Sequence, residues 1–282
     1  PYEKTRITLI DSKVILNQYG SDQYTSAIAN RRGNPTHSEV MRYNDATGRA
    51  PSNLIDKVIT DNTIDTQGRI ADQTINTYAH GTAQTQKTVI RNKFFDPRGN
   101  ATTQEIETWY VPPTGANTLI NYQIITNRTF NAQRNVLNQK VLTYDKVDPA
   151  TRQLLDVQEI RSTNFDSLTG IAKDQTVVTY SDDTATAEIV DVKITNNSNI
   201  SSSGNIGTSI ITTYLSATIA DSGAGVITAI GPIDQETITT ALSDFDIYGN
   251  AKIQTVVRKT GYVTGAFTTF AEARKIENNS FD

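Results

Sequence analysis

Residues 95–109 read Phe-Asp-Pro-Arg-Gly-Asn-Ala-Thr-Thr-Gln-Glu-Ile-Glu-Thr-Trp. Asp-x-x-Gly-Asn is typical of a tight turn, because Asp bonds the backbone two residues on and Gly takes a positive φ at no steric cost. The Thr-, Ile- and aromatic-rich stretch that follows favours a β-strand. Because the same phrase returns along all 282 residues, we interpret the chain as an array of one small unit.

The Gly of the turn is the anchor of this repeat. In the copies from Gly33 onward, Gln or Ser lies five residues after the anchor, an aliphatic residue lies seven after it, and an aromatic residue lies ten after it in all but the last copy. Placing Pro1 directly after Asp282 joins the two halves of one more turn and brings Glu3 to an anchor position. The anchors are then Glu3, Gly33, Gly68, Gly99, Arg134, Gly170, Gly204 and Gly249.

The intervals between these anchors run from 30 to 45 residues and total 282, the length of the chain. We therefore predict eight repeats of about 35 residues in a single continuous array over residues 1–282. We also expect the parent protein to continue the repeat beyond Asp282.

Each repeat reads as strand, tight turn, strand and looser turn. Short connections between strands favour an antiparallel sheet, and about sixteen strands exceed what an open twisted sheet holds without curling. We therefore expect an all-β fold in which β-hairpin repeats form a spiralling antiparallel sheet or a hollow tube. A parallel β-solenoid is the alternative. We expect no helix, a protruding loop over residues 221–235, and tight packing of the aliphatic column, exemplified by Ile106 and Val256.

The turn followed by a polar strand ending in Thr-Tyr, as in Thr143-Tyr144-Asp145, resembles the YD repeats of bacterial Rhs proteins and the related toxin-complex and teneurin shells. The resemblance covers essentially the whole chain, although Phe or Ile often replaces the Tyr before Asp. It implies a long antiparallel sheet that spirals into a hollow shell, which in several members encloses a toxic C-terminal domain. It also implies a bacterial protein that is secreted or displayed on the cell surface.

Catalytic and metal-binding patterns are weak in this sequence. There is no Cys, and the two His residues, His37 and His80, lie in different repeats. Asp246 and Asn250 exemplify turn residues whose oxygens could hold Ca²⁺, but the same residues cap tight turns, which is the interpretation we adopt. We therefore predict no enzyme, no catalytic residues, and no metal or cofactor site.

The charge pattern argues against two classes of partner. The formal charge is −4 with dispersed Lys and Arg, which gives no footprint for nucleic acid. No apolar run approaches 18 residues, so we predict no membrane insertion.

Three functional readings follow. The first is a structural segment of a long bacterial surface or secreted protein that builds a β-sheet shell, tube or filament and associates end to end with itself or with neighbouring repeats. The alternative is an adhesin that binds a glycan or a protein through its Tyr residues or its long loop. An Rhs-type shell that encapsulates a toxin is a second alternative.

Overall fold

The computed structural model describes residues 12–20, 23–44, 50–80, 82–184, 186–219, 227–246 and 249–278. The fold is all-β, with 67% strand and 6% helix. Fifteen strands follow one another in chain order in one antiparallel sheet that is not closed. The predicted all-β class and antiparallel pairing are confirmed, and the parallel β-solenoid alternative is wrong. The Glu3 anchor, the Gly223 region and the Phe281-Asp282 half-turn lie outside the described residues.

The residues fall into two compact units, which we describe separately. Unit 1 comprises Pro1–Ile124 and Thr143–Gln153, and unit 2 comprises Ile125–Leu142 and Leu154–Asp282. Strands β7 and β8 contribute to both units. Unit 1 contains β1 (Ser12–Gln18), α1 (Gln23–Arg32), β2 (His37–Tyr43), η1 (Pro51–Asn53), β3 (Leu54–Ile64), β4 (Ile70–Ala79), β5 (Ala83–Phe95), β6 (Ala101–Tyr110) and parts of β7 (Thr118–Phe130) and β8 (Val136–Tyr144). Unit 2 contains the remainder of those two strands with β9 (Leu154–Phe165), β10 (Ala172–Tyr180), β11 (Ile189–Ile200), β12 (Ile206–Ile219), β13 (Ile227–Thr239), η2 (Leu242–Asp244), β14 (Ile253–Val263) and β15 (Ala266–Glu277).

The predicted tight turns are present at six anchors. In the turn between β5 and β6, the Asp96 carboxylate accepts hydrogen bonds from the backbone N–H groups of Arg98 and Asn100, both at 2.9 Å. Gly99 has φ +84° and donates its N–H to the Asp96 carbonyl at 2.9 Å. Arg134 takes the same left-handed conformation, with φ +68°, where the other copies have Gly. The backbone conformation of the turn is therefore the same at Arg134, although Gly is absent from that position.

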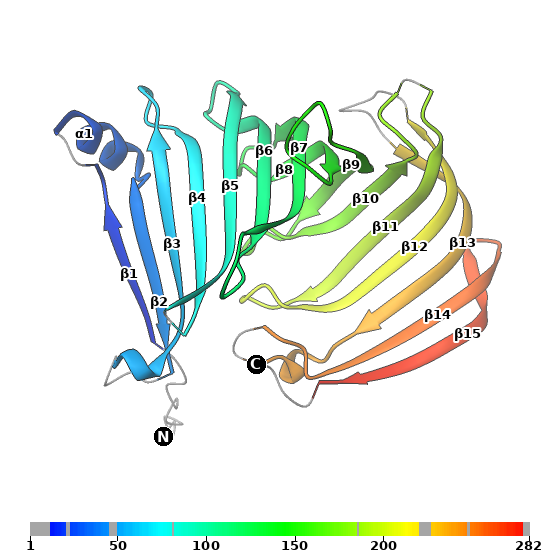
Figure 1. Ribbon diagram of the computed structural model, residues 1–282. Helices are drawn as coiled ribbons and strands as arrows, with labels where there is room; N and C mark the ends of the chain where they lie inside the picture. Colours follow the sequence, from blue (N-terminus) through cyan, green and yellow to red (C-terminus); the bar gives the residue numbers. More distant parts are fainter. Residues whose placement is uncertain are drawn as a thin grey trace, which may run out of the picture. The chain divides into compact units, whose positions relative to one another are not determined.

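The connection that contains Gly33 differs from the prediction. Helix α1 lies between β1 and β2, at one end of the strands of unit 1 (Figure 1), so the expectation of no helix is wrong. Gly33 (φ +71°) ends this helix, because its N–H bonds Asn30 O at 3.0 Å and Asn34 N–H bonds Ala29 O at 3.0 Å. Sequence inspection assigned Gly33 to a hairpin because a helix end and a tight turn both favour Gly at positive φ. The helix packs through buried Ile28 and Ala29.

The two faces of each strand follow the predicted alternation. On β10, Gln175, Val177 and Thr179 point to one face, which we call the Gln face, and Val178 and Tyr180 point to the other, the Tyr face. The fully buried large side chains among the described residues are Val157, Val178 and Val192, each at most 1% exposed. All three belong to the Tyr face, because Val178 pairs with Val192 and Tyr180 pairs with Val157.

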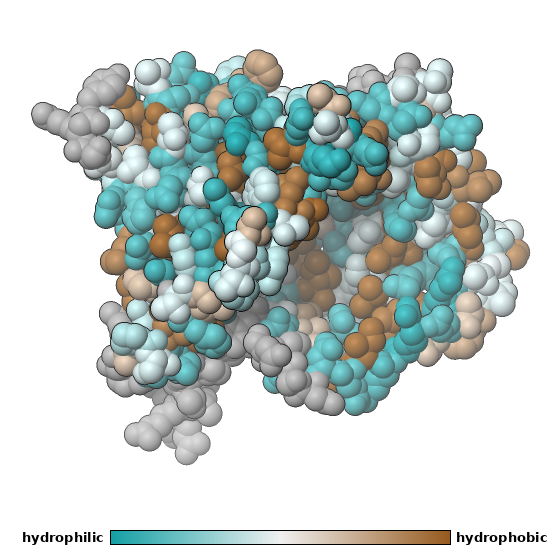
Figure 2. All heavy atoms as spheres, in the orientation of Figure 1, coloured by the Kyte–Doolittle hydropathy of each residue, from teal (hydrophilic) through white to brown (hydrophobic). Residues whose placement is uncertain are grey.

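The expectation that the aliphatic column on the Gln face is the most tightly packed is therefore wrong. Val256 is buried, at 5% exposure, but Ile106 and Val177 are only half-buried. Figure 2 shows the same mixture over the visible surface, where hydrophobic and hydrophilic residues are interspersed. In the copies anchored at Gly99, Gly170 and Gly204, the eighth side chain after the anchor is buried and the seventh is half-buried, whereas in the last copy the seventh, Val256, is the buried one.

A β-bulge recurs at the position of the repeat aromatic. The register shifts between Arg42 and Tyr43, between Thr77 and Tyr78, between Thr179 and Tyr180, between Thr213 and Tyr214, and between Arg258 and Lys259, each time against the following strand. A bulge bends its strand and increases the local twist. In Figure 1 the long strands of unit 2 bow along their length.

The predicted loop over residues 221–235 is in part a strand. Residues 227–239 form β13, which pairs with β12 from Ile219 opposite Ile227 to Thr208 opposite Thr239. The sequence obscured this strand because Gly231 and Pro232 interrupt its β-pattern. The extra length therefore extends the β12–β13 pair.

Candidate functional site

The most regular constellation in the structure is a set of side-chain hydrogen bonds at the Gln position of the repeat. At five strand pairs, the side chain five residues after the anchor donates to a polar side chain on the preceding strand or, for Thr240, directly after it. These bonds are Gln73 to Asn62 (2.9 Å), Gln104 to Asn92 (2.6 Å), Gln175 to Ser162 (3.1 Å), Ser209 to Asn197 (2.8 Å) and Gln254 to Thr240 (3.2 Å). The Gln column therefore joins consecutive strands through side chains as well as backbone.

Three of these acceptors also reach backward by one strand. The Nδ2 of Asn92 donates to the carbonyl of Ile70 on β4 at 2.8 Å, while its Oδ1 accepts from β6. The Nδ2 atoms of Asn62 and Asn197 donate in the same way to Pro35 O (2.8 Å) and Ala172 O (3.0 Å). We call these three residues the Asn bridges. Asn92 and Asn197 each span three neighbouring strands, and Asn62 joins β3 and β4 to the segment just before β2. A half-buried amide that uses both of its polar ends in this way specifies the strand register.

Sequence analysis found the Gln residues and missed the Asn residues. At Asn92, Ser162 and Asn197 the missed signal is an Asn or Ser three residues before the turn aromatic or its Ile substitute, whereas Asn62 lies two residues before Ile64. Asn is frequent throughout this chain, so the spacing is visible only once the Gln partner of each Asn is known.

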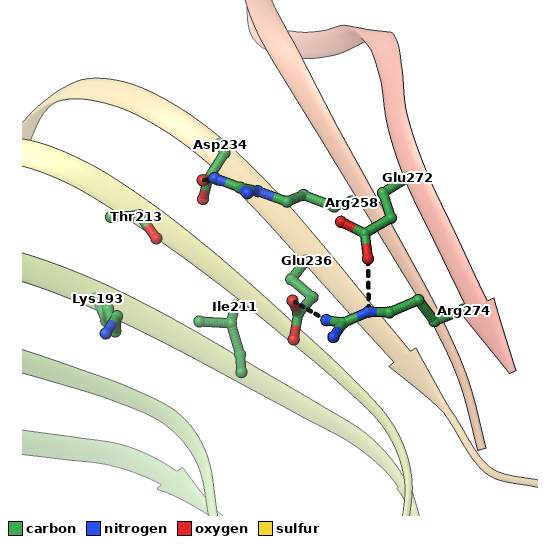
Figure 3. A pocket seen from close by; sticks show the side chains of 8 residues that line it. All are labelled: Lys193, Ile211, Thr213, Asp234, Glu236, Arg258, Glu272 and Arg274. Atoms are coloured by element: carbon green, nitrogen blue, oxygen red, sulfur yellow. Dashed lines mark hydrogen bonds and ion pairs between the residues drawn. The ribbon is translucent and has the colours of Figure 1, made fainter. Parts of the chain in front are cut away.

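The structure also forms a hollow of about 530 Å³ on the Gln face of β11–β15 (Figure 3). Its lining residues are Lys193, Ile211, Thr213, Asp234, Glu236, Arg258, Glu272 and Arg274. These side chains lie in rows across neighbouring strands, since Thr213 pairs with Asp234 and Glu236 pairs with Arg258. The hollow is thus a trough between cross-strand pairs on one face of a sheet.

The charges of this hollow neutralise one another. Arg258 Nε donates to Asp234 Oδ2 at 3.0 Å, and the Asp234 carboxylate raises the pKa of Arg258. The Arg274 guanidinium lies between Glu272 (2.7 Å) and Glu236 (3.7 Å), as Figure 3 shows. Lys193 pairs with Asp191 at 2.9 Å. Opposite charges placed across strands stabilise the pairing of those strands, and a charged ligand would have to displace these internal partners.

The Tyr face contains a second ionic group, which is buried. Arg161 Nη2 donates to Glu159 Oε2 at 2.9 Å, with side-chain exposures of 12% and 5%. Burial, together with the negative charge of Glu159, raises the pKa of the nearby Tyr180 phenol to about 12. Tyr180 therefore stays neutral at physiological pH. Tyr180 is half-buried, as expected of a strand aromatic that packs against neighbouring strands.

The structure places the residues singled out from the sequence as follows. His37 lies on β2, with Nδ1 at 2.6 Å from Asp61 Oδ1 and Nε2 at 3.5 Å from Glu39. The hydrogen bond to Asp61 raises the pKa of His37. His80 follows β4 and donates its backbone N–H to Ile55 O at 3.0 Å. His37 on β2 and His80 after β4 thus lie in separate elements and have different partners.

The turn Asp246–Asn250 uses its carboxylate for capping. Asp246 Oδ1 accepts the Asn250 backbone N–H at 2.8 Å, and Asp246 Oδ2 accepts the Asn250 side-chain amide at 2.9 Å. Within the described ranges, no group of three or more His, Asp or Glu side chains is placed to hold a metal ion. Nor does the described part of the chain contain a helix long and apolar enough to cross a membrane.

No protein-family model matches this chain, and no curated protein matches it.

Proposed function

We propose that this chain is a structural repeat segment of a long bacterial surface or secreted protein, where it builds part of a β-sheet shell, tube or filament. The observation that carries the proposal is the recurrence of one cross-strand side-chain bond at one repeat position in five strand pairs. Repeat arrays gain stability mainly from contacts between neighbouring units. A unit whose polar side chains bond its neighbours is suited to an array that is extended by adding further units.

Two other features of the sheet, the paired charges of the hollow and the recurring β-bulges, support the same role. The charges of the hollow on β11–β15 are paired with one another across neighbouring strands, which stabilises the pairing of those strands. The recurring bulges bend successive strands at the same place, which is how a long sheet acquires curvature. Both features serve a scaffold of uniform cross-section.

Electron microscopy of the full-length parent protein in negative stain tests this function. A scaffold gives a rod, tube or shell of uniform width along the repeat region. A flexible stalk that ends in distinct heads supports the adhesin alternative and contradicts the scaffold. A closed shell with dense contents supports the toxin-encapsulating alternative.

A further inference from the structure

Strand β12 lies in the longest stretch of this sequence that has no charged side chain. Residues 194–220 contain no Asp, Glu, Lys, Arg or His, and β12 itself, Ile206–Ile219, also lacks Pro and is rich in Ile and Thr. Uncharged segments of high β-propensity are the sequence signature of cross-β stacking between identical chains. Natural sequences place charged gatekeeper residues beside such segments, but along this chain the nearest charges are Lys193 and Asp221.

The fold supplies charges to β12 from the two neighbouring strands. β12 pairs with β11 on one side and with β13 on the other. Thr213 faces Lys193 on β11 and Asp234 on β13, and Ile211 faces Glu236 on β13. An interior strand also has no free backbone edge to offer a second chain. This part of β12 is therefore protected while both neighbours are in place.

The distal part of β12, residues 214–219, has a partner on one side only. The β11–β12 register ends at Val192 opposite Tyr214, and in the described part of the chain only β13 pairs with the residues beyond. A register shift between Thr213 and Tyr214 interrupts the β12–β13 pairing, and Pro232, opposite Tyr214, has no N–H to donate. A two-stranded pair is marginally stable by itself, so this end opens more readily than the rest of β12.

We propose that residues 214–219 stack with the same residues of a second copy of this chain, as a cross-β assembly, when the distal end of β13 detaches. The segment reads Tyr-Leu-Ser-Ala-Thr-Ile, which is long enough for one interdigitating β-segment. Identical uncharged strands stack in register without placing like charges opposite each other. The inference goes beyond the proposed function, because it concerns an opened form of the chain and holds whether or not the folded array is a scaffold.

Thioflavin T fluorescence of the full chain follows the formation of such stacks. Leu215→Lys places a charge in the segment at a side chain that is 69% exposed in the fold. We expect the lag time to lengthen about threefold to tenfold, because the added charges lie opposite one another in every layer of the stack. Leu155→Lys is the matched control, since it makes the same charge change at a 60% exposed Leu on β9 and should leave the lag time unchanged. Equal lag times for the two variants, or no fluorescence from the unsubstituted chain, overturn the proposal.

A loss of stability does not mimic the expected delay, because a less stable chain opens more often and stacks sooner. Circular dichroism gives the thermal midpoint of each variant, and each is assayed at the same interval below its own midpoint. Hydrogen exchange of the mature aggregates then locates their core. We expect protection over residues 214–219. A protected core elsewhere, such as the uncharged residues 118–127 of β7, contradicts the proposal.

A reversible cross-link tests whether β13 must detach. Ser216 and Ile230 lie opposite each other on β12 and β13, and the chain has no Cys of its own. Ser216→Cys combined with Ile230→Cys can therefore form a disulfide, and we expect the oxidised protein to show no growth of fluorescence and the reduced protein to recover it. Thr260→Cys with Thr269→Cys makes the same cross-link between β14 and β15 and should leave the lag time unchanged on oxidation. If the oxidised β12–β13 variant aggregates as fast as its reduced form, the proposed route is wrong.

Discussion

Asn92 on β5 and Gln104 on β6 lie directly opposite each other, and the Gln104 side chain donates to the Asn92 side chain at 2.6 Å. The Nδ2 group of the Asn92 amide donates to Ile70 O on β4. One half-buried side chain thereby ties together three strands. The same arrangement at Asn62 and Asn197 makes it a property of the repeat.

Asn92→Ala tests the energetic importance of an Asn bridge. The substitution removes the hydrogen bonds that Asn92 makes with Gln104 Nε2 and with Ile70 O, so we expect a loss of about 1–3 kcal/mol in the free energy of unfolding. The measurement is the urea midpoint. Asn117→Ala is the control, because Asn117 is exposed on the loop before β7, and it should change stability by less than about 0.5 kcal/mol. Equal losses for the two variants would show that the bridge is energetically unimportant.

Arg134→Gly should stabilise the protein. Arg134 has φ +68°, a left-handed conformation that costs a side-chain-bearing residue about 1–2 kcal/mol, while the greater freedom of Gly in the unfolded chain offsets part of the gain. We expect a net increase of about 0.5–1 kcal/mol, on the scale of other backbone-conformation substitutions. Gln133→Gly, at the neighbouring exposed position without positive φ, should destabilise the protein instead. Thermal midpoints of both variants compare the two signs.

Val178→Ala tests how tightly a Tyr-face residue is packed. Val178 is fully buried, and we expect its truncation to cost about 1–3 kcal/mol. Val190 is 64% exposed on the neighbouring strand β11, and its truncation to Ala should change stability by less than about 0.5 kcal/mol. Chemical denaturation of the two matched Val→Ala variants gives the comparison. A larger loss at Val190, which the register leaves unpaired at the β10–β11 bulge, would contradict the tight packing of Val178.

His37 should make stability depend on pH. The hydrogen bond to Asp61 raises the pKa of His37 above its usual value of 6.5, so folding favours the protonated ring. This stabilisation is fully present below pH 6.5 and is lost as the pH rises through the higher pKa of the folded state.

Thermal melts between about pH 5.5 and about pH 8.5, the range in which His titrates, measure this dependence. Asp61→Asn removes the charge that raises the pKa of His37 and should flatten the curve between those limits. If the variant and the parent chain lose stability in parallel over this range, the His37–Asp61 pair is not the cause.

Local features of the architecture were predictable from the sequence. The Asp-x-x-Gly-Asn turn depends only on the ability of Asp to bond nearby N–H groups and on the ease with which Gly takes positive φ, both of which act within five residues. The alternation of Gln175, Val177 and Thr179 with Val178 and Tyr180 follows from the two-residue period of a strand. Short connections then favoured antiparallel pairing, and the structure has it.

Tertiary structure decided the features that depend on residues distant in sequence. Gly33 ends helix α1, although its sequence matches the tight turns, because positive φ at Gly suits both structures. Alternation identifies two faces but does not say which one is covered, so only the fold showed that Val157, Val178 and Val192 are buried together. The Asn bridges likewise join strands 11 to 27 residues apart in sequence. An isolated Asn carries no mark of such a role, because the role comes from the carbonyl and the amide that the sheet places on its two sides.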